Sequence, residues 1–117
     1  MKIRKAQQIL KTLAESTRLR IINLLSHEDL NVSQICRIID KKQPAVSKHL
    51  AHLRLVDMVD TKRDGLHVYY YLKEPATRIK SSLVDAVTLG LADLETFQKD
   101  LDKLRKIKKK SPKLAKK

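Results

Sequence analysis

Apolar residues recur at the three- and four-residue spacing of an α-helix through the first half of the chain. A first helix is marked by Ile3, Ala6, Leu10, Leu13 and Ala14. A second helix, which begins near Ser16 or Thr17 as cap, is marked by Leu19, Ile22 and Leu25. A third, short helix, with Asn31 as its N-cap, is marked by Val32, Ile35, Cys36 and Ile39. The pattern therefore predicts three consecutive amphipathic helices.

A fourth helix follows after a short polar turn. Pro44 suits the first turn of a helix, where its missing N–H costs nothing, and Gln43 is expected at the N-cap. Val46, Leu50 and Leu53 fall at i, i+4 and i+7, so one stripe faces a core and the other faces are polar, small or cationic. Such a surface suits a helix that enters the major groove of DNA. An ordinary amphipathic surface helix has the same pattern.

With Asp40-Lys41-Lys42 as the turn, the third and fourth helices form a helix-turn-helix pair. The candidate DNA contacts on the fourth helix are Gln43, Ala45, Ser47, Lys48, His49, His52 and Arg54. His49 and His52 lie three residues apart, but a metal site needs three or four ligands and no carboxylate of this helix has matching spacing. DNA contact or packing is therefore expected of both histidines.

From Asp57 the hydrophobic period changes to alternation, which predicts a β-hairpin. The alternating residues are Met58 and Asp60, then Leu66, Val68 and Tyr70. Asp64-Gly65 fits a two-residue turn between the strands, so the hairpin reads as a wing. The expected contacts of the wing are Lys62, Arg63 and His67, and a solvated hairpin tip is the alternative. The Tyr69-Tyr70-Tyr71 run is expected in a core or interface, with stacking on bases as the alternative.

Pro75 opens a final helix, because the apolar residues then step by fours and threes as far as Ile107. One helix of this length is about 50 Å long, which is too long for so small a domain to cover, so the stripe predicts a dimer. The expected interface residues are Leu83, Val87, Gly90, Leu94, Phe97 and Leu101. Gly90 allows close helix approach or, alternatively, bends the helix.

Three motifs occur in the order that is typical of the ArsR/SmtB family of bacterial transcriptional repressors. They are the helix pair at residues 10–22, Val46-Ser47-Lys48-His49-Leu50, and the strand at residues 65–72. The chain resembles this family from about Lys5 to Leu72. The resemblance implies a mainly α fold with a small β-hairpin (α+β), a winged helix-turn-helix that forms a homodimer through its first and last helices. It also implies DNA half-sites about 34 Å apart, base and phosphate contacts by Gln43, Ser47 and Lys48, and a wing that touches the adjacent minor groove or backbone.

The resemblance raises the question of a metal, but the chain departs from the metal-sensing patterns. Family sensors of arsenic, cadmium and lead carry Cys-Val-Cys at the start of the third helix, where this chain has Asn31-Val32-Ser33 and so lacks the thiolates that soft metals require. Family sensors of zinc and nickel carry histidines on the last helix, and no histidine follows His67. Cys36 is the single cysteine, on an apolar stripe where an inert thiol is expected. We therefore expect no metal and no cofactor.

The charge of the chain favours a polyanion or an anionic membrane surface as partner. Its 26 Lys and Arg against 13 Asp and Glu leave a net charge of +13, and nine of the basic residues against one acidic residue fall in residues 101–117. We expect residues 1–107 to form one DNA-binding and dimerisation domain. Residues 108–117 are expected to be a basic, disordered tail.

Several classes of protein are disfavoured. No run approaches the roughly 18 apolar residues that span a bilayer, the N-terminus has no signal-peptide pattern, and one cysteine fits a reducing compartment, so a cytoplasmic protein is expected. No Gly-rich phosphate loop or nucleophile motif supports an enzyme. We interpret the chain as a sequence-specific repressor that acts as a homodimer on double-stranded DNA, without metal and with an unknown effector. The alternatives are a basic architectural DNA-binding protein of low selectivity and a module that pairs with a different subunit.

Overall fold

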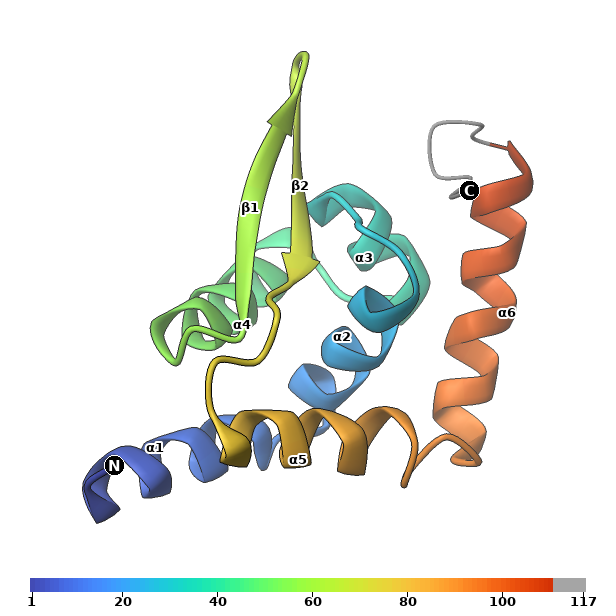
Figure 1. Cartoon of the computed structure of the whole chain (residues 1–117). Helices are drawn as coiled ribbons and strands as arrows, with labels where there is room; N and C mark the ends of the chain where they lie inside the picture. Colours follow the sequence, from blue (N-terminus) through green and yellow to red (C-terminus); the bar gives the residue numbers. More distant parts are fainter. Residues whose placement is uncertain (111–117) are drawn as a thin grey trace.

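The computed structural model describes residues 1–110 of the 117-residue chain. The elements in order are α1 (Ile3–Leu13), α2 (Ser16–His27), α3 (Val32–Ile39), α4 (Gln43–Leu55), β1 (Val59–Asp64), β2 (His67–Leu72), α5 (Arg78–Thr88) and α6 (Glu95–Lys110). The two strands form a hairpin that projects from the helical body, and α6 stands on the side opposite α4 (Figure 1). The mainly α fold with a small β-hairpin is thus confirmed.

The first three helices lie where the hydrophobic spacing predicts them, and polar side chains cap the second and the third. Glu15 caps α2, in place of the expected Ser16 or Thr17, because its carboxylate accepts a hydrogen bond from the Arg18 backbone N–H at 2.9 Å. Asn31 caps α3 as predicted and forms a capping box with Gln34. These caps fix the first residues of α2 and α3.

The helix-turn-helix pair is formed by α3 and α4. Asp40 takes the left-handed conformation, with φ of 56°, and so ends α3 within the predicted turn. Lys42 is the N-cap of α4, so Gln43 is the first helical residue and its predicted cap position is wrong by one residue. The three residues of the predicted core stripe, Val46, Leu50 and Leu53, are fully buried. Their burial fixes the rotation of α4 about its own axis.

The hairpin turn lies one residue beyond its predicted position. Asp64 pairs with His67, which leaves Gly65 and Leu66 as the two turn residues. Gly65 has φ of +63° and supplies the positive φ that a type II′ turn needs at its first position. Leu66 is 95% exposed at the tip and Val68 is also exposed, whereas Tyr69 on the opposite face of β2 is buried. The prediction that the tyrosines pack in the core is confirmed for Tyr69.

The base of the wing is joined to the helices by backbone bonds. The Tyr70 N–H donates to the Leu30 carbonyl at 2.7 Å, and the Leu30 N–H donates to the Tyr70 carbonyl at 3.1 Å. The bridge attaches β2 to the segment between α2 and α3. The wing is therefore fixed to the helix-turn-helix at its base, while its tip extends into solvent (Figure 1).

The predicted single helix from Pro75 to Ile107 is wrong, because the chain turns between α5 and α6. The Leu89 N–H donates to the Asp85 carbonyl at 2.8 Å, and the Gly90 N–H donates to the same carbonyl at 3.1 Å, five residues back, so the last turn widens and the helix ends there. A Cβ on Gly90 would lie 2.5 Å from the Ala86 carbonyl oxygen, which explains the glycine. After the turn, α6 packs on α2 and α3.

This turn divides the predicted dimer stripe. Val87 and Phe97 are buried in the core of their own protomer, and Phe97 is only 2% exposed. Leu83 and Leu101 are partly buried against the same core, whereas Gly90 and Leu94 are exposed. A continuous helix seam through all six residues therefore does not exist. The stripe of α6 instead closes the core of the protomer over α2.

Two ion pairs hold α6 against α2. Arg20 and Asp100 form a bidentate pair, with Nε–Oδ2 and Nη2–Oδ1 distances of 2.9 and 2.8 Å. Lys108 reaches the buried carboxylate of Glu28, with 2.8 Å between Nζ and Oε1. Lys108 to Lys110 belong to α6, so the first three residues of the predicted tail are helical, and the remainder of that tail, residues 111–117, lies outside the described part. Within residues 1–110, no helix has the length and apolar character that crossing a membrane requires.

Candidate nucleic-acid interface

The free side of α4 carries most of the predicted base contacts. Gln43, Ala45 and Lys48 are exposed, and Ser47 is half-buried. Because the buried stripe fixes the helix rotation, these side chains point away from the core. Gln and Ser can hydrogen-bond to base edges, Lys can reach bases or phosphates, and the small Ala45 leaves room for close approach.

His49 is held inside the protein. Its Nδ1 accepts a hydrogen bond from Arg18 Nε at 3.1 Å, and its Nε2 lies 3.9 Å from Glu15 Oε2. Burial is the main cause that lowers the pKa of His49, and the charges of Arg18 and His52 lower it further, against the opposing effect of Glu15. A neutral imidazole with an unprotonated Nδ1 fits this bond. His49 therefore joins α4 to α2, and this geometry does not support the predicted DNA contact.

Arg54 and Lys62 are both paired with carboxylates. Arg54 Nη2 lies 3.1 Å from Asp60 Oδ1, which joins the end of α4 to β1. Lys62 pairs with Asp29 and lies 5.6 Å from the centre of the Tyr71 ring, and its hydrogen bond to Asp29 raises the pKa of Lys62. The first contact lies near the base of the wing and the second joins β1 to the segment between α2 and α3, so these two predicted DNA contacts help to hold the wing in place.

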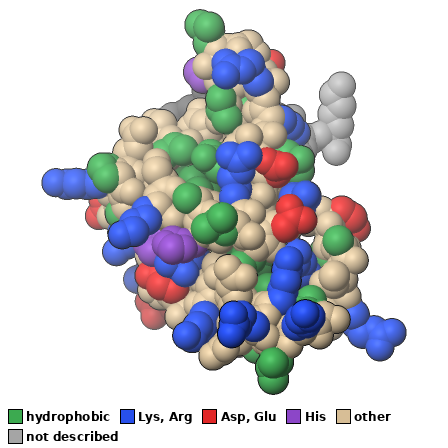
Figure 2. Space-filling model, turned by 90° about the vertical axis from the view of Figure 1, so that its left-hand side faces the viewer, with side chains coloured by type: hydrophobic (Ala, Val, Ile, Leu, Met, Phe, Trp, Pro, Cys, Tyr) green, Lys and Arg blue, Asp and Glu red, His purple; other side chains and the backbone are tan. Residues whose placement is uncertain are grey.

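Arg63 and His67 remain exposed near the tip of the wing. The His67 ring lies 6.1 Å from the Tyr69 ring and is tilted against it. Figure 2 shows this side of the molecule, with cationic side chains on the wing at the top and more of them around the histidines and towards the foot. Acidic side chains are fewer on this face. The face that presents α4 is thus also cationic.

Comparison with known proteins identifies this arrangement. The family model "Bacterial regulatory protein, arsR family" matches residues 15–61. The transcriptional repressor PagR of Bacillus anthracis is 38% identical over 76 residues, which cover 64% of this chain and 76% of PagR. The chain belongs to the ArsR family. Its winged helix-turn-helix is the DNA-binding domain of a transcriptional regulator.

Two further relatives support this assignment to the ArsR family. The transcriptional regulator KmtR of Mycobacterium tuberculosis is 31% identical over 80 residues, which cover 68% of this chain, and the chain spans only 60% of the length of KmtR. The crystal structure of the transcriptional repressor BigR from Xylella fastidiosa aligns with a TM-score of 0.69 and 27% identity, over 80% of this chain and 89% of BigR. The likeness to BigR confirms the winged helix-turn-helix fold.

The residues at the metal positions of the ArsR family do not fit a metal. Asn31 uses its side-chain oxygen to cap α3, by accepting from the Gln34 N–H at 2.8 Å, and Ser33 is exposed. Cys36 is half-buried, and burial raises the pKa of its thiol, which disfavours the thiolate. In the part of the chain that the structure describes, no three His, Cys, Asp or Glu side chains gather as metal ligands would. Metal independence stays a prediction.

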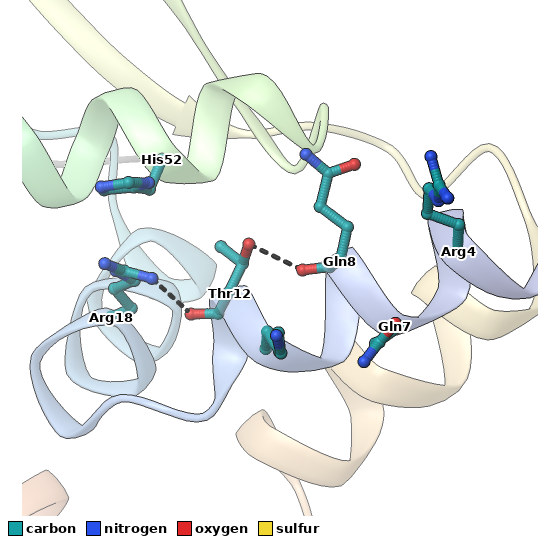
Figure 3. Close-up of a pocket in the computed structure, with 7 residues that line it drawn as sticks. Arg4, Gln7, Gln8, Thr12, Arg18 and His52 are labelled. Carbon is teal, nitrogen blue, oxygen red and sulfur yellow. Dashed lines mark hydrogen bonds between the residues drawn. The ribbon is translucent and has the colours of Figure 1, made fainter.

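Sequence reasoning missed a polar groove between α1 and α4, which has a volume of about 510 Å³ (Figure 3). Its lining residues are Arg4, Gln7, Gln8, Lys11, Thr12, Arg18 and His52. Of these, only His52 was a predicted DNA contact. The seven-residue spacing of Arg4 and Lys11 places them on one face of α1, but the sequence does not show that α4 lies opposite.

Proposed function

We propose that the protein is a metal-independent repressor that binds a specific operator as a homodimer and so blocks a promoter. The observation that carries the proposal is the free side of α4, where Gln43, Ser47 and Lys48 are accessible on a helix whose core stripe is fully buried. A helix fixed in this way loses little conformational freedom when it enters the major groove. PagR and BigR, which are named as repressors, support repression as the function of this relative.

In the proposed complex, α4 reads the major groove and the wing contacts the neighbouring backbone or minor groove. Gln43 and Ser47 hydrogen-bond to base edges, and Lys48 contributes charge. Arg63 and His67 at the wing tip provide the flanking contact. Because the partner is DNA, we place the protein in the cytoplasm, where Cys36 stays a free thiol. A binding role without catalysis accounts for these features, and the effector that releases the operator is unknown.

The homodimer is proposed from apolar side chains that the protomer leaves in water. Ile3 and Leu10 on α1 are exposed, and so are Leu89 and Leu94 between α5 and α6, with Ile3 87% and Leu89 73% exposed. Exposed leucine and isoleucine in such number favour burial against a second copy. A two-fold dimer would present two copies of α4 to half-sites about 34 Å apart.

Selection of bound fragments from genomic DNA tests the proposal, because it yields the operator and the degree of specificity together. On that operator, we expect Lys48→Ala to weaken binding to all DNA. Gln43→Ala is expected to relax the preference at one base position per half-site by about 1–3 kcal/mol. Lys103→Ala, on the exposed side of α6, removes the same charge as a control. Unchanged operator affinity in both α4 variants would refute the assignment of α4.

A second candidate is an architectural DNA-binding protein, which the net charge of +13 favours. In that case the basic residues of 101–117 dominate binding and the helix adds little selectivity. Competition between operator and unrelated DNA separates the two. Removal of residues 109–117 keeps the Lys108–Glu28 ion pair. The ratio of specific to nonspecific affinity should then stay unchanged or rise for a repressor, and should fall if the basic segment itself reads the site.

A further inference from the structure

The groove between α1 and α4 is lined by permanent cations from α1 and α2 and by a histidine from α4. Arg4 and Lys11 come from α1, Arg18 from the start of α2 and His52 from α4, and none of the residues that line the groove is acidic. In Figure 3, Gln8 points from α1 toward α4, His52 lies over Arg18 at one end of the groove, and Arg4 lies at the other end. Three permanent positive charges therefore surround one open space.

The positive charge of Arg18 is not neutralised within the described residues. Its Nε donates to His49 Nδ1 at 3.1 Å and its Nη1 donates to the Thr12 carbonyl at 3.2 Å, and both acceptors are neutral groups. Arg20, Arg54 and Arg105, by contrast, each contact a carboxylate. The half-buried Arg18 guanidinium is thus held in place while no carboxylate of residues 1–110 forms an ion pair with it.

The side chains of Arg4 and Lys11 also form no hydrogen bond or ion pair among residues 1–110, and both residues are exposed. Their seven-residue separation on α1 is about 10 Å along the helix axis, so they lie at two points along the groove. An oxyanion with several acceptor atoms suits this set, because a guanidinium binds phosphate through two parallel hydrogen bonds and a lysine adds a point charge. The ligand chemistry is therefore that of a phosphate group.

The position of the groove indicates the source of that phosphate. The recognition helix α4 contacts β1 on one side and α1 on another, so the wing and the groove flank it (Figure 1). A helix in the major groove has a sugar–phosphate strand along each side. We propose that the groove binds a backbone phosphate of the operator on the side of α4 away from the wing. This inference rests on the proposed DNA-binding function.

A phosphate in the groove would contact three helices at once. Arg18 already holds α4 through His49, and His52 belongs to α4 itself. The phosphate thus fixes the position of α4 across the major groove and leaves base reading to Gln43 and Ser47. Its contribution to affinity is the same for every DNA sequence, because every nucleotide carries the phosphate.

The first test is the double variant Arg4→Gln/Lys11→Gln, which removes two charges without breaking any hydrogen bond or ion pair of the described residues. We expect operator and unrelated DNA both to bind about fivefold to twentyfold more weakly. The slope of log affinity against log salt should fall by about 0.9 for the one phosphate lost. Lys103→Gln/Lys106→Gln, on exposed positions of α6, removes the same charge and should leave the slope unchanged.

The second test replaces single phosphates of the operator by neutral methylphosphonates. One such replacement, on the side of α4 away from the wing, should lower the operator affinity of the wild-type protein by the same factor as the double substitution does. The same replacement should lower the affinity of the double variant almost no further. Additive losses at every phosphate would overturn the inference. If Lys48→Ala loses operator binding while Arg4→Gln/Lys11→Gln keeps full affinity and slope, the inference fails and the proposed function stands.

A free phosphate compound is the other source of the same chemistry. Inorganic phosphate titrated into the DNA-free protein, followed by NMR of the α1 amides, separates the two sources. Binding only at tens of millimolar, lost in the double variant, agrees with a backbone phosphate. Saturation by inorganic phosphate below 1 mM, together with unchanged DNA affinity of the double variant, would overturn the inference. The ligand of the groove would then be a free phosphate compound. Absence of operator binding by the wild-type protein would instead refute the proposed function.

Discussion

The Arg20–Asp100 pair fixes α6 to α2. Removal of either partner should lower the unfolding free energy, and the loss should differ between the two partners. The Asp100 side chain is 2% exposed and the Arg20 side chain is 20% exposed. The hydrogen bond from Arg20 to Asp100 raises the pKa of the arginine, so the guanidinium stays charged through the neutral range. Arg20→Met leaves an unpaired carboxylate in the core, whereas Asp100→Asn leaves a guanidinium that can turn to water.

The expected magnitudes follow from this difference in exposure. Removal of one partner of a buried pair costs about 3–5 kcal/mol, so we expect that range for Arg20→Met. For Asp100→Asn we expect about 1–3 kcal/mol, because the remaining guanidinium is partly solvated and the amide keeps one acceptor. The double variant Arg20→Met/Asp100→Leu should recover to within about 2 kcal/mol of the wild type, since no charge is then left buried.

Urea unfolding followed by circular dichroism at 222 nm measures these costs, at one fixed protein concentration so that dimerisation does not vary. The exposed Asp102–Arg105 pair of α6 is the control, and Arg105→Met should change the unfolding free energy by less than about 0.5 kcal/mol. The reasoning is refuted if Arg20→Met also stays within 0.5 kcal/mol, or if the double variant loses the sum of the two single losses.

Four further predictions concern the core, the proposed dimer, the recognition helix and metals. Phe97→Ala should lower the unfolding free energy by about 3–5 kcal/mol, as for a core aromatic, whereas Leu94→Glu should split the dimer in sedimentation without unfolding the protomer. Because the pKa of His49 lies below its ordinary value of 6.5, stability should be complete above pH 6.5 and fall as the pH drops toward the lowered pKa. Replacement of His49 by Gln should remove that part of the pH profile. Zinc, cadmium or arsenite at modest excess should not release the operator, and tight stoichiometric binding coupled to release in a titration would contradict this.

The local signals in the sequence predicted the parts of the fold that depend on neighbours along the chain. Asn31 caps α3 and the Val46, Leu50 and Leu53 stripe is buried, because a cap and a helical face are both set within two turns. The break at Gly90 could not be read in this way. The apolar spacing from Val87 to Phe97 keeps the same phase whether the chain forms one helix or two, so tertiary packing of α6 decides the outcome.

In the candidate site too, features set by near neighbours along the chain were predicted, and contacts between distant residues were not. Gln43, Ser47 and Lys48 were predicted because a helix pattern alone shows which side chains lie off the core stripe. The bond from Arg18 to His49 joins residues 31 positions apart, and the pair of Arg20 with Asp100 spans 80 positions, so no periodicity marks either one. The groove residues of α1 look like an ordinary solvated face until α4 is placed beside them.

The left-handed Asp40 in the turn before α4 makes the protein less stable, and its binding to DNA weaker, than a glycine at the same position would. A glycine at this position would adopt the same φ without the steric cost of about 1 kcal/mol that a side chain brings. It would also remove a negative charge that precedes Lys41 and Lys42 and repels the DNA phosphates. One substitution would thus make the protein both more stable and slower to leave DNA. In the proposed repressor, the aspartate therefore favours release from the operator.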